Sequence, residues 1–446
     1  MRLSREVLRL AVPSILANIT VPLVGMADVA IAGHLAAGYS SAALIGGISI
    51  GTMLFDLLYW NFAFLRTGTG GLTAQAFGRG GQGVGSILTR ALRIAMLSGL
   101  GLIAIQALVV WLAFLIVPCS EEVRILATRY FYIRIWAAPA TLSLFALKGW
   151  FIGMQDSVRP MTADLLVNGV NIAASVLLAL GLPGVFDGLG FPGIAIGTVI
   201  AQWSGFLYCL IALRCRYRAV FARGERQAVE SRGFFALNRD LFLRSLGMMA
   251  VYIGFTVISA RFGDMVLAVS TILMKLLMLF SYFTDGFAYA AEALTGRFIG
   301  ERNADGLRSA VRYSFLWSSA VAALFMLLYG FGGSWLFSLM TSSGEVVAAG
   351  RAYIPWLLLM PVVGCAAFVW DGVYIGATAS APLRNSTLLC AVGFFAVWFV
   401  GRYLIPAPEM ALHILMAAYF MHLLVRGVYL TWRSRTLFSL MNLPAR

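Results

Sequence analysis

Charged residues are scarce in this chain of 446 residues: Asp, Glu, Lys and Arg together make up 12% of it, whereas hydrophobic residues make up 61%. In a soluble domain, about a quarter of the residues are charged. The apolar runs are long enough to cross a bilayer, which needs about 20 apolar residues for each helix. The composition therefore excludes a string of soluble domains and indicates one polytopic membrane protein.

Lysine is almost absent, because Lys148 and Lys275 are the only two and arginine supplies the rest of the positive charge. The net charge of +14 would also suit a protein that binds nucleic acid. The arginines, however, gather in alternate loops between the apolar runs, as they do in membrane proteins whose positive loops stay in the cytoplasm. We therefore expect no nucleic-acid partner.

Motifs of catalysis and metal binding are missing too. The sequence contains no P-loop, nucleophile elbow or HExxH pattern, and without a Walker motif it cannot drive transport directly with ATP. The cysteines form no CxxC pair, and we expect them to be small buried hydrophobic residues. They are Cys119, Cys209, Cys215, Cys365 and Cys390. We expect neither an enzyme nor a bound cofactor.

The apolar runs predict an all-α fold of twelve transmembrane helices. The first run has no small-residue cleavage site, so we interpret it as a retained helix rather than a signal peptide. Because the arginine-rich loops follow the even-numbered spans, both termini are expected in the cytoplasm, with the protein in the cell (inner) membrane. The expected spans are 7–33, 42–66, 87–117, 124–148, 160–181, 193–213, 241–262, 266–290, 309–339, 347–370, 385–404 and 409–432.

The two halves of the chain repeat each other at a distance of 222 to 223 residues. The matched pairs are Arg129 and Arg351, Pro139 and Pro361, Thr73 and Thr295, Gly78 and Gly300, Gly149 and Gly372, and Gly153 and Gly376. Such duplications are typical of secondary transporters, and six spans per half make the repeat a parallel one. We predict two pseudo-symmetric six-helix lobes, residues 1–213 and 241–446, joined by a basic cytoplasmic linker at 214–240.

Asp28 lies within the first predicted span, flanked by apolar residues. It stands about 21 residues into the span, roughly 30 Å from its cytoplasmic start at 1.5 Å per residue. An ionisable residue inside a span indicates a functional site, because a carboxylate there can exchange a proton or bind a small cation. The alternative is a solvated carboxylate at the outer interface.

A polar stripe follows one face of the predicted fifth span, with Asp164, Asn168, Asn171 and Ser175 at helical spacing. Asn171, Ser175 and Thr198 of the sixth span are expected at a depth similar to that of Asp28. Carboxylate, amide and hydroxyl oxygens suit Na⁺ or a proton, so we interpret these residues, with Asn168, as a cation-coupling site. Hydrogen bonding between helices is the alternative, and for Asn168 the two are evenly balanced.

Two prolines, Pro13 and Pro22, lie inside the first span, where proline bends a helix. The bend is either static or part of a moving helix, and the sequence leaves both open. Other charges also fall within predicted spans, and some must form ion pairs that sequence cannot match. They are Asp56, Arg134, Lys275, Asp285, Glu292 and Asp371. For Asp371, which begins an Asp-Gly pair, we expect local capping at a turn.

Five segments stand out in chain order: VPLVGMADVAIAGHL, WNFAFLRTGTGGLTAQAFG, KGWFIGMQDSVRPM, DGFAYAAEALTGRFIG and DGVYIGATASAPLRN. They resemble motifs of the multidrug and toxic compound extrusion (MATE) family, specifically its DNA-damage-inducible-F (DinF) branch. The resemblance covers nearly the whole chain. It implies two six-helix lobes around a central cleft, and export of organic, often cationic and amphipathic compounds driven by an inward H⁺ or Na⁺ gradient.

By position, the resemblance puts Asp28 on the coupling acid of helix 1, Asn171 on its helix-5 partner and Thr198 on the helix-6 threonine. It allows Na⁺ at these three residues. Some family members carry a second acid where this chain has Ser175, so the choice of ion stays open. We expect a monomer that contacts membrane lipids and small-molecule substrates. The alternatives are a flippase for lipid-linked precursors and an intramembrane enzyme.

Overall fold

The computed structural model describes residues 2–33, 35, 40–117, 119–182, 184–222, 231–341 and 343–439. Within these ranges the chain forms helices and one short antiparallel hairpin, in which Gly181 pairs with Asp187. The elements are α1 (Arg2–Gly33), α2 (Ser41–Trp60), α3 (Phe64–Gly78), α4 (Val84–Ala104), α5 (Gln106–Ile116), α6 (Glu121–Arg134), η1 (Ile135–Ala137), α7 (Ala138–Gly153), α8 (Val158–Leu180), β1 (Gly181–Leu182), β2 (Phe186–Asp187), α9 (Phe191–Arg216), α10 (Arg218–Ala222), α11 (Ser231–Ala260), α12 (Asp264–Gly300), α13 (Ala304–Met340), α14 (Gly344–Gly350), η2 (Arg351–Tyr353), α15 (Ile354–Gly376), α16 (Ser380–Leu404), η3 (Pro408–Met410) and α17 (Ala411–Ser439).

The prediction of twelve spans is confirmed: in the described part of the chain, 12 helical segments are long and apolar enough to cross a membrane. Several are longer than expected. The second runs from Ala43 to Gly78 and the eighth from Met265 to Gly300, so the segments GLTAQAFG and ALTGRFIG are helical. The expected span 87–117 is interrupted at Ile105, between α4 and α5. Short helical breaks divide other spans, as between α2 and α3.

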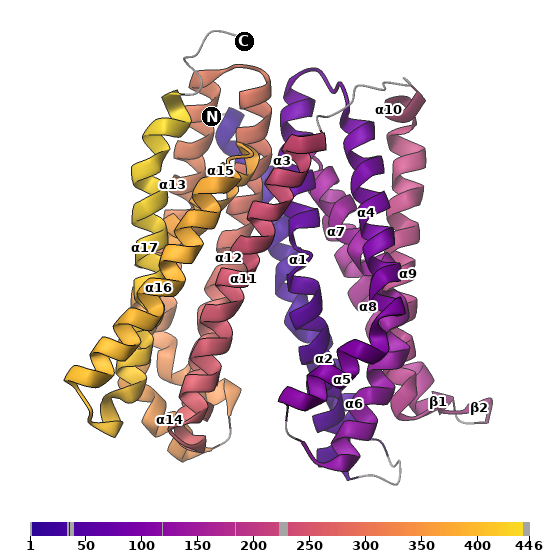
Figure 1. The fold of residues 1–446 in the computed structure, drawn as a ribbon, viewed down its shortest axis with the longest axis vertical. Coiled ribbons are helices and arrows are strands. Elements are labelled where there is room, and N and C mark those ends of the chain that lie inside the picture. Colours follow the sequence, from indigo (N-terminus) through magenta and orange to yellow (C-terminus); the bar gives the residue numbers. More distant parts are fainter. Residues whose placement is uncertain are drawn as a thin grey trace.

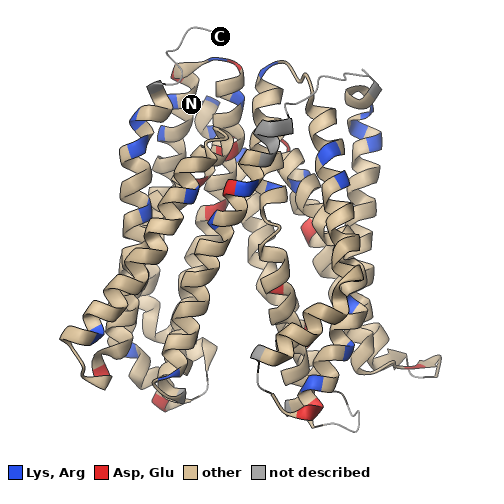
Figure 2. Ribbon diagram, in the orientation of Figure 1, with Lys and Arg blue, Asp and Glu red and all other residues tan. Residues whose placement is uncertain are grey.

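The helices form two groups, and the two termini lie at the same end of the molecule (Figure 1). Helices α2 to α10 make up one group and α11 to α17 the other, while α1 packs against both α8 and α12. Lys and Arg residues are frequent at the end that carries the termini (Figure 2). The predicted linker 214–240 includes α10 and the start of α11, and its residues 223–230 lie outside the described part.

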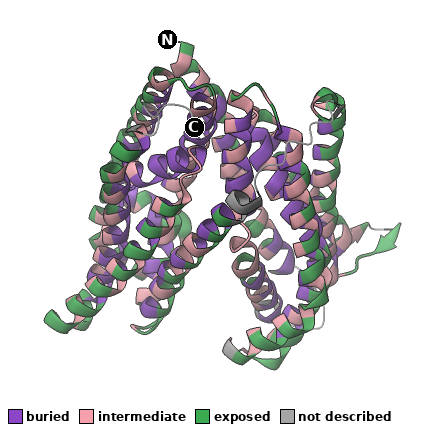
Figure 3. Cartoon of the chain, turned by 45° about the horizontal axis from the view of Figure 1, so that its top comes forward, coloured by how far each residue is buried: buried purple, intermediate pink, exposed green. Residues whose placement is uncertain are grey.

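Burial is uneven among the spans. In the span from Glu121 to Gly153, 78% of the most apolar stretch is buried, against 28% for the span from Val158 to Leu180, so α7 is an inner helix of its half. Buried segments concentrate where the helices of the two groups meet near the terminal end, and exposed residues cover the outer faces (Figure 3). The start of α1 shares a hydrophobic cluster with α12: Val7, Leu10 and Ala11 pack with Phe287 and Ala291.

Two glycines related by the repeat meet where α3 and α12 end. A Cβ atom at Gly78 would collide with the carbonyl oxygen of Arg297, and one at Gly300 with the carbonyl oxygen of Gln75. Gln75 and Arg297 are themselves 222 residues apart, so the two contacts are equivalent under the repeat. A residue can touch its own repeat partner only near the axis that relates the halves. The axis of the parallel repeat therefore passes through this contact.

Each half also contains a close glycine contact that is equivalent to one in the other half. A Cβ atom at Gly149 of α7 would collide with the carbonyl oxygen of Arg66 on α3, and one at Gly372 of α15 with that of Ala288 on α12. Small residues allow membrane helices to approach backbone to backbone, which compensates for the absence of a hydrophobic driving force inside a bilayer. The repeated glycines are therefore explained by packing.

Replacing Gly78 by alanine should lower the thermal unfolding midpoint of the purified protein in detergent. The added methyl group has no space against Arg297, and overpacking of this kind costs about 1–3 kcal/mol. Gly101→Ala is the matched control, because a Cβ atom there meets nothing within 4 Å. Equal midpoints for the two variants would contradict the tight α3–α12 contact.

Candidate functional site

The polar residues predicted on the fifth and sixth spans come together between α8 and α9. The Asn171 amide donates a hydrogen bond to the Thr198 hydroxyl at 3.0 Å. The hydroxyls of Thr198 and Ser175 both donate to the carbonyl of Ile194, at 3.2 and 3.3 Å. Asn171, Ser175 and Thr198 are all buried. Asn168 points elsewhere, since its amide donates to Thr20 of α1 at 2.7 Å.

Asp28 is buried in α1, with 6% of its surface exposed. Its Oδ1 atom has no hydrogen-bond partner in the described structure, and neither has Oδ1 of Asn171. No hydrogen bond joins Asp28 to Asn171 or Thr198 among the described residues. The predicted contact is therefore not made in this conformation and stays a prediction.

The bond between Thr20 and Asn168 sets the depth of α1 relative to α8. Counted along both helices away from the end that carries the termini, Asp28 lies about 12 Å from that level, Asn171 about 4.5 Å and Ser175 about 10 Å, at 1.5 Å per residue. Asp28 is therefore closer in depth to Ser175 than to Asn171. Pro13 and Pro22 both lie inside α1, which stays helical through them.

Arg134, the last residue of α6, is a half-buried cation in the same half of the molecule. It donates to the hydroxyls of Thr52 and Tyr130, at 3.3 and 3.0 Å, and stacks over the ring of Phe55. The sequence shows a lone arginine in an apolar span, but it cannot show that these hydroxyls and this ring are its partners.

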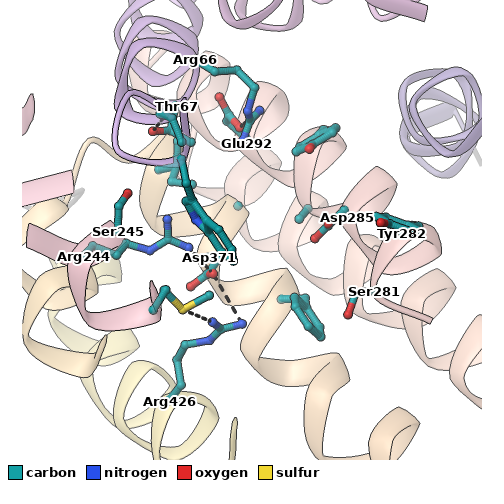
Figure 4. Close-up of a pocket in the computed structure, with 18 of the residues that line it drawn as sticks. Arg66, Thr67, Arg244, Ser245, Ser281, Tyr282, Asp285, Glu292, Asp371 and Arg426 are labelled. Carbon is teal, nitrogen blue, oxygen red and sulfur yellow. Dashed lines mark hydrogen bonds and ion pairs between the residues drawn. The ribbon is translucent and has the colours of Figure 1, made fainter. Parts of the chain in front are cut away.

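A second polar site lies between α3 and the helices of the other half, in a cavity of about 250 Å³ (Figure 4). Arg66 of α3 pairs with Glu292 of α12 at 3.5 Å and lies over the ring of Tyr289. Asp371 of α15 pairs with two arginines, Arg244 of α11 at 2.6 Å and Arg426 of α17 at 3.6 Å. The site thus joins four helices of one half to α3 of the other.

The expectation about Asp371 was wrong. Asp371 does not cap a turn: it lies buried inside α15, and Gly372 serves the close approach of α15 to Ala288 rather than a turn. Lys148, at the end of the expected span 124–148, belongs to α7 and pairs with Asp164 of α8. Of the cysteines expected to be buried, Cys215 is exposed.

Comparison with known proteins identifies the family. The family model described as MatE matches residues 13–177 and 241–400. The chain belongs to the MatE family. The DNA damage-inducible protein F of Escherichia coli (strain K12) is 35% identical to this MatE chain over 96% of the chain and 93% of the relative. A probable multidrug resistance protein NorM of Photorhabdus laumondii is 22% identical over 89% of this chain and 86% of the relative.

The fold agrees with that family. A crystal structure of MATE in the bent conformation superposes with a TM-score of 0.85 at 17% sequence identity. The match covers 99% of this chain and 98% of the chain in that structure. The MatE chain is therefore a multi-pass membrane transporter and not an enzyme. Among the described residues, no group of three or more His, Cys, Asp and Glu could hold a metal ion.

Replacing Asp371 by asparagine should destabilise the protein strongly, because Arg244 and Arg426 would both lose their counterion. Breaking a buried ion pair in this way costs about 3–5 kcal/mol. The measurement is the thermal unfolding midpoint in detergent. Asp305→Asn is the control, since its side chain is 96% exposed. A midpoint for Asp371→Asn as high as that of the control would show that the pairing adds no stability.

Proposed function

We propose that this MatE protein is an antiporter that exports lipophilic, often cationic organic compounds by alternating access. An inward gradient of H⁺ or Na⁺ drives the export. Residues 1–213 and 241–446 act as two lobes that rock against each other, joined by the linker at 214–240. The protein works as a monomer in the cell (inner) membrane, with both termini in the cytoplasm.

One observation carries the proposal: two buried oxygen acceptors, Oδ1 of Asp28 and Oδ1 of Asn171, have no donor in the described structure. A buried polar atom without a partner costs about 1–3 kcal/mol. A proton on Asp28 supplies a donor, and a sodium ion bound by Asp28, Asn171 and Thr198 satisfies both acceptors in a conformation that brings the three residues together. Oxygen ligands of this kind suit either cation.

The position of α1 explains how a cation at Asp28 acts on the whole molecule. On one side Thr20 of α1 accepts the amide of Asn168 on α8, and on the other Asn18 donates to the carbonyl of Tyr282 on α12 at 3.1 Å. A ligand shifts an equilibrium only through its different affinity for the two states. A cation that changes the packing of α1 therefore changes the contact between the lobes.

Aromatic side chains favour organic substrates in the cleft between the lobes. Trp60 and Tyr252 approach each other across it with their ring centres 5.2 Å apart, and both line the cavity with Tyr282, Tyr289 and Phe368. Aromatic faces attract organic cations through cation–π contacts and bury their apolar parts.

Asp28→Asn should abolish gradient-driven efflux of ethidium from proteoliposomes while leaving the unfolding midpoint unchanged. The substitution keeps the shape of the side chain and removes the charge that takes up H⁺ or Na⁺. Asp187→Asn in the exposed hairpin is the matched control and should transport normally. Normal gradient-driven efflux by Asp28→Asn would remove Asp28 from the mechanism.

Asn171→Ala should weaken coupled efflux more than Asn168→Ala. Asn171 donates to Thr198 and keeps its side-chain oxygen free for a cation, whereas the Asn168 amide donates to Thr20 of α1. The measurement is the initial rate of efflux at a fixed gradient, with protein amounts matched. If the two variants lose equal activity, Asn171 has only the structural role of joining α8 to α9.

A further inference from the structure

Two opposite charges lie inside membrane spans without a partner, one in each half of the molecule. Asp56 belongs to α2 and Lys275 to α12, and both residues are exposed. In the described part of the chain, neither of them forms an ion pair or a hydrogen bond. An ionised group within a span either pairs with another charge or faces a water-filled space. Asp56 and Lys275 therefore face water rather than lipid in this conformation.

Both charges lie on the helix faces that line the cavity. Asp56 precedes Trp60 by one helical turn, and Trp60 lines the cavity. Lys275 precedes Met278 by one turn and Tyr282 by two, and both of these residues also line it. The span that contains α2 and α12 both run toward the end that carries the termini (Figure 1). The two charges therefore lie beyond the cavity, on its side away from the termini.

The internal repeat places the two charges at nearly the same depth. With the offset of 222, Asp56 is equivalent to Met278, and Lys275 is equivalent to Met53. Equivalent residues lie at equal depth, because the axis of a parallel repeat runs along the membrane normal. Lys275 therefore lies about 4.5 Å farther from the terminal end than Asp56, at 1.5 Å per residue. The long side chain of a lysine spans this difference.

The halves diverge at the level of these charges. Figure 1 shows the two groups of helices together at the end that carries the termini and apart at the other end. Trp60 and Tyr252 still touch beside the cavity, with ring centres 5.2 Å apart, whereas Asp56 and Lys275 form no ion pair among the described residues. Closing the far end would bring the facing sides of α2 and α12 together and remove the water between them.

Closure makes the two charges depend on each other. A charge left alone in a buried space is costly, whereas an opposite charge beside it compensates much of that cost. The attraction also grows as water leaves, because the local dielectric constant falls. Neither charge has a charged equivalent, since the repeat places methionine at both matching positions, Met53 and Met278. Each charge thus finds its complement only across the cleft.

We propose that Asp56 and Lys275 form an ion pair between the lobes that closes the cleft at the end away from the termini. The pair is absent in this conformation and present in the alternate one, so it stabilises only the state in which that end is closed. The inference rests on the proposed function, because it requires two lobes that rock against each other. It gives the closed state a stabilising contact that needs no bound substrate or cation.

Arg134 is the rival partner of Asp56 within the first half. It donates to the hydroxyl of Thr52, one turn before Asp56 on α2, at 3.3 Å. If Asp56 served Arg134, the charge of Lys275 would have no effect on the closed state. Lys275→Met separates the two, since methionine keeps an unbranched apolar chain and removes the charge.

The test measures how often the far end of the cleft is closed. Spin labels are attached after Glu122→Cys and Glu345→Cys, in a chain whose 5 native cysteines have been substituted. These two exposed residues lie in the first turns of α6 and α14, at the end away from the termini and in different groups (Figure 1). Double electron–electron resonance on the full chain in lipid nanodiscs then gives the populations of short and long distances, which report the closed and open states.

Asp56→Asn and Lys275→Met should each lower the ratio of short to long distances about tenfold, at a pH and Na⁺ concentration where the parent chain shows both. Asp305→Asn, on a side chain 96% exposed, is the control and should not change the ratio. Reversing one charge, by Asp56→Lys or Lys275→Asp, should also lower it. The two reversals together should restore the ratio to within about threefold of the parent, which a folding defect would not allow.

Two results would overturn the ion pair alone: a double reversal no better than the single ones, or a ratio that Lys275→Met leaves unchanged. Long distances only, in every condition, would show that this end does not close, and would overturn the antiport as well. Rescue of the ratio by the double reversal, without gradient-driven ethidium efflux by the wild-type protein, would leave the pair standing and overturn the antiport.

Discussion

Close backbone contact between α3 and α12 is the constraint on which the rest of the structure depends. Inside a bilayer helices gain little from the hydrophobic effect and associate through small residues and buried polar contacts. Gly78 and Gly300 meet at the axis of the repeat, and the polar contacts lie beside them: Gln75 donates to the carbonyl of Gly376 and the hydroxyl of Thr378, both at 3.1 Å. The lobes are thus held together at the end that carries the termini. We call this contact between α3 and α12 the seam, and it contains few side-chain atoms.

The charged groups of the two halves differ in how they are paired. In the first half, Asp28 is buried with an unpaired oxygen, and Arg134 bonds the hydroxyls of Thr52 and Tyr130. At the cavity, Arg66 of the first half pairs with Glu292 of the second, and Arg244 pairs with Asp371 within the second half. α1 contacts both halves, so under the proposed mechanism a cation bound in the first half changes the packing that the second half depends on. The proposed coupling site then lies in the first half and the cavity between the halves, and α1 and the seam connect them.

Much of this could be predicted from the sequence, because it depends on local patterns. Hydrophobic runs predicted the twelve spans, the 222-residue offset predicted the paired glycines, and helical spacing predicted that Asn171 and Ser175 share one face of the fifth span, where both are buried. The cavity could not be predicted, since Arg244 and Asp371 are 127 residues apart and only tertiary packing brings them together. Asp371 was misread because a glycine after an acid suggests a turn, while Gly372 is needed for contact with another helix.

Locking the seam tests whether the lobes must separate there during transport. Gln75 and Thr378, which touch across it, are replaced by cysteines in a chain whose 5 native cysteines have been substituted. A short disulfide-forming cross-linker then joins them, and ethidium efflux from proteoliposomes is followed under an inward cation gradient. We expect the cross-linked protein not to export and a reducing agent to restore export. Full efflux by the cross-linked protein would contradict it.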